Sequence, residues 1–277
     1  MNLFRNIWQY SNLLSLDVVV GAMAGMLFFS DVLGTSLSID IYGLLGLAVW
    51  AVYTADHLMD ARRAKNPAVS ERHRYHQNNF NLLSIILILV SISGLLYVLI
   101  IDSLRFILIP GIALAVCMVI WMGSIQYLGI KLAWLKEFST ALFYVLGIAL
   151  APFFSIYPDG VSNFFYLFLF GYFLIALLNL FILSFIDEKV DMLDGFGSAL
   201  SILNKSGLER LILVLASIGG FIFFIALFLL PSYFRMHTLI LLVLIIFHVK
   251  EFYDQDISHI RKKLEASFLL PLVLIAF

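Results

Sequence analysis

Apolar stretches long enough to cross a lipid bilayer recur along this chain, and they leave few folds open to it. A transmembrane helix needs about 20 mostly apolar residues, and stretches of about that length lie at 13–33, 41–61, 80–101, 106–124, 138–156, 163–186, 208–230 and 237–250. Only 13% of the residues are charged, roughly half the share of an average soluble domain. The pattern predicts an all-α fold, a multi-pass transmembrane helical bundle that forms a single domain over residues 1–277.

A ninth apolar stretch, from Ala266 to Phe277, is shorter than the others. It would give about 18 Å of helix, less than the ~30 Å hydrocarbon core of a bilayer. We therefore expect about nine helices, the last being a half-helix, a re-entrant end or an incomplete span.

The single cysteine, Cys117, lies in an apolar stretch and is expected to be a small buried side chain rather than part of a disulfide or a metal site.

The basic residues predict the orientation of these helices. When the loops are assigned to alternate sides of the membrane, fifteen Lys and Arg residues fall on one side, and only Arg105 and Arg235 fall on the other. Because the cytoplasmic side carries the excess of basic residues, we expect a cytoplasmic N-terminus and a cytoplasmic active site, in a bacterial inner membrane. The net charge of −1 shows no excess of positive charge of the kind that binds nucleic acid.

Two aspartate pairs occupy matching places in this topology. Asp56 and Asp60 lie at the end of the second stretch, and Asp187 and Asp191 lie at the end of the sixth; each pair reads Asp-x-x-x-Asp. With four stretches per unit, the chain divides into two parallel four-helix halves that carry the same motif on their second helix. Sites in membrane proteins built from such repeats lie at the interface between the repeats.

The spacing of the aspartates favours a divalent cation. Residues i and i+4 share one helix face about 5–6 Å apart, so two carboxylates placed there repel each other unless a cation lies close by. Carboxylates around one cavity suit Mg²⁺, which takes few protein carboxylates and is commonly shared with substrate phosphates. We therefore predict that Asp56, Asp60, Asp187 and Asp191 are the metal ligands and the catalytic residues.

Basic and polar residues near the motifs predict a phosphate-bearing substrate. Arginine recognises phosphate oxygens through paired hydrogen bonds, and a polar site that opens into an apolar bundle suits an isoprenoid diphosphate surrounded by membrane lipid. The candidate substrate-binding residues lie beside the motifs, in the next cytoplasmic loop, or in or near the spans: Asn12, Tyr53, Arg62, Arg63, Arg72, Arg74, Lys131, Lys136 and Asn179.

Other polar residues near the motifs have less specific expectations. His57, His73 and His76 are expected to face lipid headgroups or phosphate, because a metal site built on histidines needs more of them at tighter spacing. Asp194 is explained as well by an ordinary loop position as by a role in the site.

The chain resembles the UbiA superfamily of intramembrane prenyltransferases over roughly residues 13–210. Residues 187–198 read Asp-x-x-x-Asp-x-x-x-Gly-x-x-Ser, which is similar to the second aspartate-rich motif of that family. Residues 127–131 read Tyr-x-x-x-Lys and are followed by Lys136, similar to the Tyr/Lys stretch of the family. The resemblance adds Tyr127 to the candidate substrate-binding residues.

This resemblance implies a function as well as a fold. Members of the family have about nine helices and move an isoprenoid group from an allylic diphosphate, held with Mg²⁺, to an acceptor. For this chain it implies a Mg²⁺-dependent prenyltransferase with an apolar acceptor, either aromatic or lipid. The first motif departs from the family pattern, because Val52 and Tyr53 stand where the family has Asn-Asp.

Two other functions stay open. A non-catalytic carrier of isoprenoids or lipids could use the same fold without the chemistry. A phosphotransferase of the CDP-alcohol kind is a weaker alternative: Asp191-x-x-Asp194-Gly195 is similar to the start of that signature, but the arginine expected soon afterwards is missing. Mg²⁺-dependent release of pyrophosphate from an allylic diphosphate would separate the transferase from both.

Overall fold

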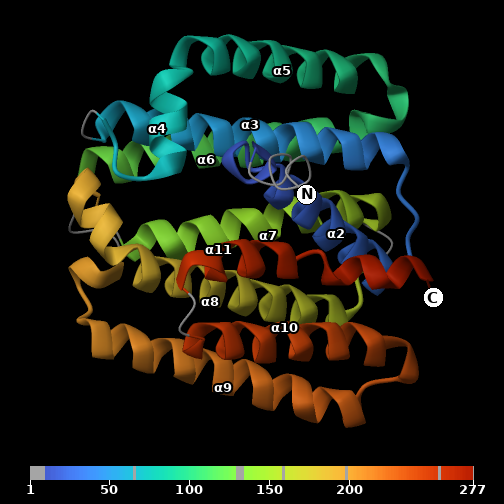
Figure 1. Ribbon diagram of the computed structural model, residues 1–277. Coiled ribbons are helices and arrows are strands. Elements are labelled where there is room, and N and C mark those ends of the chain that lie inside the picture. The colour runs from blue at the N-terminus through green and yellow to red at the C-terminus, as the bar shows by residue number, and fades with distance from the viewer. Residues whose placement is uncertain are drawn as a thin grey trace, which may run out of the picture.

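A computed structural model of the chain describes residues 10–64, 67–128, 134–157, 160–196, 199–254 and 257–276. The regular structure in these residues is helical throughout (Figure 1). The elements are α2 (Leu16–Val32), α3 (Ile39–Arg63), α4 (Glu71–Asn78), α5 (Phe80–Ile100), η1 (Asp102–Ile107), α6 (Leu108–Leu128), α7 (Trp134–Ile156), α8 (Asn163–Asp194), η3 (Ala199–Ser201), α9 (Lys205–Leu229), η4 (Ser232–Phe234), α10 (Arg235–Tyr253), α11 (Ile257–Ser267) and η5 (Leu270–Ala276).

Seven helices of the described residues are long and apolar enough to cross a membrane, fewer than the nine predicted. They are α3 and the six helices from α5 to α10, and they confirm the class of a multi-pass helical membrane protein. The first and last predicted stretches differ from the expectation. Helix α2 has 17 residues, about 26 Å of helix, and the last stretch forms η5, a 3₁₀ helix of 7 residues.

The local backbone explains why these two stretches are short. Ser15 has a φ of 56°, in the left-handed region, and α2 begins directly after it. Gly34, with a φ of 63°, turns the chain just after the other end of α2. In η5, Pro271 has no N–H to continue an α-helix and disfavours the α conformation in the residue before it. Pro271 is buried in this position.

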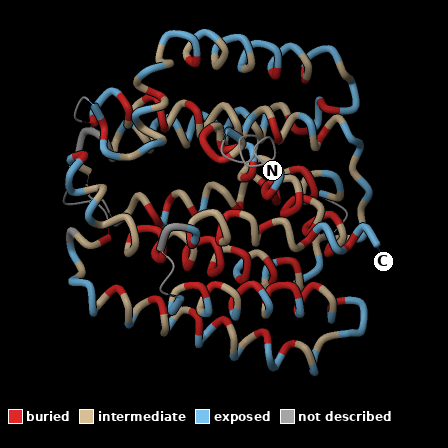
Figure 2. The backbone as a smooth tube through the Cα atoms, in the orientation of Figure 1, coloured by how far each residue is buried: buried red, intermediate tan, exposed pale blue. Residues whose placement is uncertain are grey.

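Helix α8 forms the centre of the bundle. In its most apolar window 61% of the residues are buried, and Phe168, Ile175 and Ile182 are fully buried. Helices α2, α7, α9 and α10 pack against it. Helix α5 lies at the outside (Figure 2), and only 11% and 6% of the residues are buried in the most apolar windows of α5 and α6. Their outward Leu, Ile and Val side chains form an apolar surface suited to lipid.

The prediction that Cys117 is buried is wrong, since this cysteine is exposed on the outer helix α6.

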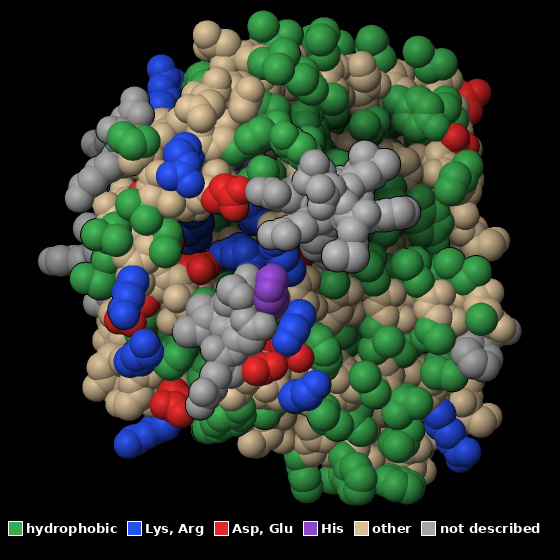
Figure 3. All heavy atoms as spheres, in the orientation of Figure 1, with side chains coloured by type: hydrophobic (Ala, Val, Ile, Leu, Met, Phe, Trp, Pro, Cys, Tyr) green, Lys and Arg blue, Asp and Glu red, His purple; other side chains and the backbone are tan. Residues whose placement is uncertain are grey.

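The helix ends that carry the aspartate motifs lie at one end of the bundle. The C-terminal ends of α3, α8 and α10 lie there together with the N-terminal ends of α5, α7 and α9 (Figure 1, left). We call this the motif end. Many of the Lys, Arg, Asp and Glu side chains visible in the same view gather over it (Figure 3), so the loops that were predicted to share one side of the membrane meet there.

Close packing of α8 against α9 and α10 makes a stability prediction possible. A Cβ atom added to Gly171 would lie 2.6 Å from Cε2 of Phe223 and 2.9 Å from Cδ1 of Leu241, and both of these side chains are fully buried. Gly171→Ala should therefore destabilise the fold by about 1–3 kcal/mol through overpacking, which thermal unfolding in detergent would measure. Gly220→Ala is the matched control, because its Cβ would meet open space; an equal loss of stability in both variants would contradict the packing.

Candidate functional site

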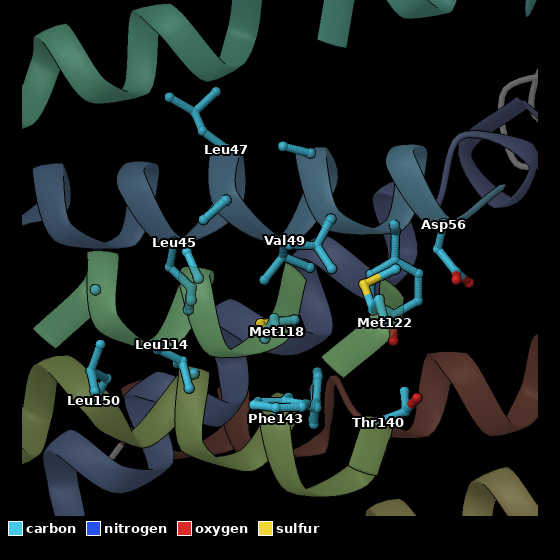
Figure 4. A pocket seen from close by; sticks show the side chains of 18 of the residues that line it. Leu45, Leu47, Val49, Asp56, Leu114, Met118, Met122, Thr140, Phe143 and Leu150 are labelled. Carbon is cyan, nitrogen blue, oxygen red and sulfur yellow. The ribbon is translucent and has the colours of Figure 1, made fainter. Parts of the chain in front are cut away.

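A cavity of about 740 Å³ runs between helices α3, α5, α6 and α7. Its volume falls in the range of ligand-binding pockets. In Figure 4, Asp56 and Thr140 lie at one end of the cavity, and Leu45, Leu114 and Leu150 lie at the other. The cavity therefore has a polar end at the motif end of the bundle and a long apolar body.

The first aspartate pair lies at the polar end of this cavity. Asp56 and Asp60 both line it, together with Lys136 from the start of α7. The Nζ atom of Lys136 lies 3.2 Å from Oδ2 of Asp60 and 3.9 Å from Oδ1 of Asp56. The Asp56 and Asp60 side chains are 31% and 14% exposed. The two carboxylates thus share one cation and stay open to a ligand in the cavity.

The second aspartate pair is close by but is held differently. An Nη2–H of Arg261, on α11, donates to Oδ2 of Asp187. The charges of Asp187, Arg261 and Lys136 all act on Asp191, one turn further along α8. Lys136 therefore lies within electrostatic range of both aspartate motifs. The structure brings the two motifs to one region, with only the first of them on the cavity wall.

A buried polar network beside the site takes up two of the predicted substrate-binding residues. Asn12 donates from Nδ2 to Oδ2 of Asp17 at 2.7 Å and to Oε2 of Glu265 at 2.6 Å. Arg72 donates to the carbonyl oxygen of Asn12 at 3.1 Å and lies 3.4 Å from Oε1 of Glu265. Burial opposes ionisation of Glu265, but Arg72 and Arg261 outweigh it, so the pKa of Glu265 lies below its usual value. Asn12 and Arg72 thus serve to join α2, α4 and α11.

The other predicted substrate-binding residues divide between the cavity and the surface. Tyr53 and Arg63 line the cavity. Arg62 is exposed, with its guanidinium 5.7 Å from the ring centre of Phe80, and Arg74 is exposed on α4. Asn179 lies in α8 with a buried side-chain oxygen that has no partner among the described residues. Lys131 and the side chain of Tyr127 lie outside the described residues.

Asp194 is not an ordinary loop acid. Its side chain is fully buried, and its carboxylate accepts hydrogen bonds from the backbone N–H groups of Val69 at 2.7 Å and Ser70 at 3.2 Å. His73 lies 3.1 Å from the same carboxylate. The end of α8 therefore holds the start of α4, which ties the segment after the first motif to the second.

The histidines have structural contacts of the same kind. Nε2 of His57 lies 3.2 Å from the hydroxyl of Ser15, and Nδ1 of His76 lies 2.9 Å from the carbonyl oxygen of Arg72. Both histidines are buried, and burial lowers the pKa of His76. Instead of facing headgroups, they pack between α2, α3 and α4.

We expect Asp194→Ala to loosen α4. The change removes the charged acceptor of two backbone hydrogen bonds, at a cost of about 1.5–3 kcal/mol, so trypsin should cleave faster after the exposed Arg74. Glu188→Gln is the matched control, because it removes a carboxylate from the same end of α8 that pairs with the exposed Lys205. Equal cleavage rates in the two variants would show that Asp194 does not anchor α4.

Sequence reasoning missed Arg261 and Glu265, which the structure places beside the second motif. They lie between the apolar stretches 237–250 and 266–277, in a segment where Ile257, Ile260, Leu264 and Phe268 recur every three or four residues. That spacing is the signal of an amphipathic helix, and the segment does form α11. The pairing of Arg261 with Asp187, 74 residues away in sequence, carried no sequence signal, although Asp187 itself was predicted from its motif.

The residues present fit Mg²⁺ on the chemistry of their donor atoms. No group of three or more His, Cys, Asp or Glu side chains forms a ready metal site within the described ranges. Mg²⁺ does not need one, because it binds through one or two carboxylates and completes its shell with water and phosphate oxygens. Asp56 and Asp60 supply hard oxygen donors one helical turn apart at the polar end of the cavity, which is the set that such an ion takes.

No family model, curated protein or solved structure matches this chain. The resemblance to the UbiA superfamily therefore rests on the motifs and on the placement of the helices.

Proposed function

We propose that this chain is a Mg²⁺-dependent membrane prenyltransferase of the UbiA type, which moves an isoprenoid group from an allylic diphosphate to an apolar acceptor, aromatic or lipid. One observation carries the proposal: a long apolar cavity ends at two carboxylates one helical turn apart, with a lysine between them. An amphiphile with a metal-binding phosphate head and an apolar chain is complementary to that shape and charge.

The polar end of the cavity would hold the diphosphate. Asp56 and Asp60 would bind Mg²⁺, and Lys136 and Arg63 would bind phosphate oxygens. Mg²⁺ supplies neutralisation of the charge that develops on the departing diphosphate. The bond between the allylic carbon and the diphosphate oxygen breaks, both electrons leave with the diphosphate, and the acceptor forms the new bond and loses a proton.

The apolar body of the cavity would hold the isoprenoid chain and the acceptor. Aromatic residues on its wall, Tyr53, Phe143 and Tyr144, can stabilise positive charge on the allylic group through their ring faces. Trp121 also lines the cavity, and its Nε1–H is buried with no partner among the described residues. A hydrogen-bond acceptor on the bound molecule would satisfy it. The apolar wall keeps water from competing with the acceptor.

The charges at the motif end support the orientation that we propose for the protein. Fifteen Lys and Arg residues lie in the segments assigned to that side of the membrane, which supports a cytoplasmic N-terminus and active site in a bacterial inner membrane. A water-soluble diphosphate head would then reach the site from the cytoplasm.

Release of pyrophosphate tests the proposed function. Detergent-purified protein, supplied with farnesyl or geranylgeranyl diphosphate and membrane lipid extract as the source of acceptor, should release pyrophosphate with Mg²⁺ and not with EDTA. Diphosphate binding without release, in the presence of lipid extract, would favour the carrier. Absence of Mg²⁺-dependent binding would contradict both the transferase and the diphosphate site.

A further inference from the structure

Arg261 connects two carboxylates at the motif end. One nitrogen of its guanidinium contacts Asp187 of α8, and the other lies 3.3 Å from Oε1 of Glu265, one turn further along α11. Glu265 is also held by Arg72 and Asn12. Glu265 is therefore fixed by the buried network, while the Arg261 side chain extends from α11 to the second motif.

The contact between Arg261 and Asp187 is partly open to solvent. The Arg261 side chain is 35% exposed and the Asp187 side chain is 26% exposed. An ion pair of this kind contributes little to stability, and breaking it leaves no fully buried charge. The pair can therefore exchange its partners when a stronger ligand arrives.

The two motifs share this arrangement. In each, a cation from another helix lies against the aspartates: Lys136 from α7 against Asp56 and Asp60, and Arg261 from α11 against Asp187. The four motif carboxylates outnumber these two cations, so negative charge remains for metal ions to neutralise. Lys136 and Arg261 are held where a metal bound to the same carboxylates would displace them.

We propose that Arg261 is a diphosphate-binding residue that serves as the counter-ion of Asp187 until the substrate arrives. With Mg²⁺ and a diphosphate present, Asp187 would hold the metal ion, and the Arg261 guanidinium would turn from that carboxylate to the phosphate oxygens. A guanidinium suits this exchange, because its fork of N–H groups matches phosphate as well as carboxylate. Glu265 keeps Arg261 at the site during the exchange. The inference rests on the proposed function and adds the C-terminal helix α11 to the site.

Two binding measurements on the full chain in detergent test the exchange, with inorganic pyrophosphate as the probe. In Arg261→Gln, Mg²⁺ alone should bind several-fold more tightly, because Asp187 has lost its competing cation. Pyrophosphate in the presence of Mg²⁺ should bind about 10–100-fold more weakly, because a charged hydrogen-bond donor is lost. Titration calorimetry would measure both affinities.

Lys263→Gln is the matched control. Lys263 lies on the same helix and pairs with Glu251 and Asp254, so the variant loses the same charge and should change neither affinity. Arg261→Lys keeps the charge and loses the fork, and should weaken pyrophosphate binding by about 3–10-fold. Arg261→Lys also tests the proposal if the Arg261→Gln variant does not yield monodisperse protein.

The opposite directions of the two changes separate this proposal from a structural role. If Arg261 only braced α8 against α11, its removal would weaken both ligands together or neither, and that result would overturn the proposal. Wild-type protein that binds pyrophosphate with Mg²⁺, beside Arg261 variants of equal affinity, would overturn the role of Arg261 alone. Wild-type protein that binds no pyrophosphate with Mg²⁺ would overturn the proposed function as well.

Discussion

Asp56→Asn should lower Mg²⁺-dependent pyrophosphate release by about 10²–10³-fold, the usual effect of removing one group that stabilises charge in a transition state. Asp56 lies on the cavity wall and faces the ligand space directly. The amide cannot neutralise a metal ion, although its size is the same as that of the carboxylate. Lys136 keeps its closer partner, Asp60, at 3.2 Å, so the local fold should persist. Initial rates over a range of Mg²⁺ concentrations would measure the effect.

A control variant distinguishes the role of Asp56 from a general loss of fold. Asp102→Asn is the matched control, because Asp102 is exposed and pairs with Arg105 on the segment η1, at the other end of the bundle. It should retain the wild-type rate and Mg²⁺ dependence. If Asp56→Asn kept the wild-type dependence on Mg²⁺, the first motif would not be a metal site.

Gly147→Phe should block the apolar body of the cavity. Gly147 lines the cavity, and a Cβ atom there would meet open space. It lies eleven residues beyond Lys136 on α7, about 16 Å along the helix, so a phenyl ring would obstruct the chain rather than the head group. We expect release from geranylgeranyl diphosphate to fall at least tenfold, and release from the shorter geranyl diphosphate to fall much less.

The dependence on chain length is the critical measurement for Gly147. Competition between geranyl and geranylgeranyl diphosphate in one assay would give the ratio of their kcat/KM values directly. Gly220→Phe is the control, since a side chain there also meets open space but the residue does not line the cavity. An unchanged ratio in Gly147→Phe would mean that the isoprenoid chain does not lie in this cavity.

Some of the site could be predicted because it depends on local geometry. Asp56 and Asp60 share a face of α3 by helical periodicity alone, and both line the cavity. Tyr53 does so for the same reason, one turn earlier. Lys136 was predicted to accompany the motifs, and the structure places it between the two carboxylates. To predict these residues it was enough to know the helix on which each lies and the end of the bundle at which it lies.

Other residues could not be assigned from the sequence, because their partners are far away along the chain. Asn12 was predicted to reach a substrate, but it is buried against Glu265, which is 253 residues away. Asp194 holds the start of α4, 125 residues earlier. In each case a polar residue near the site could have faced either a ligand or another helix, and only the packing of that helix decided between them.

The sequence by itself determined the class of the protein and the end of the bundle that carries its charges. Both follow from hydropathy and helical periodicity, which are properties of short segments. The tertiary structure decided which aspartates face the cavity, which cations hold them, and where α11 lies. These depend on how each helix is rotated about its own axis against its neighbours. That rotation is set by the packing of many side chains at once, such as the close contact at Gly171, and no short segment encodes it.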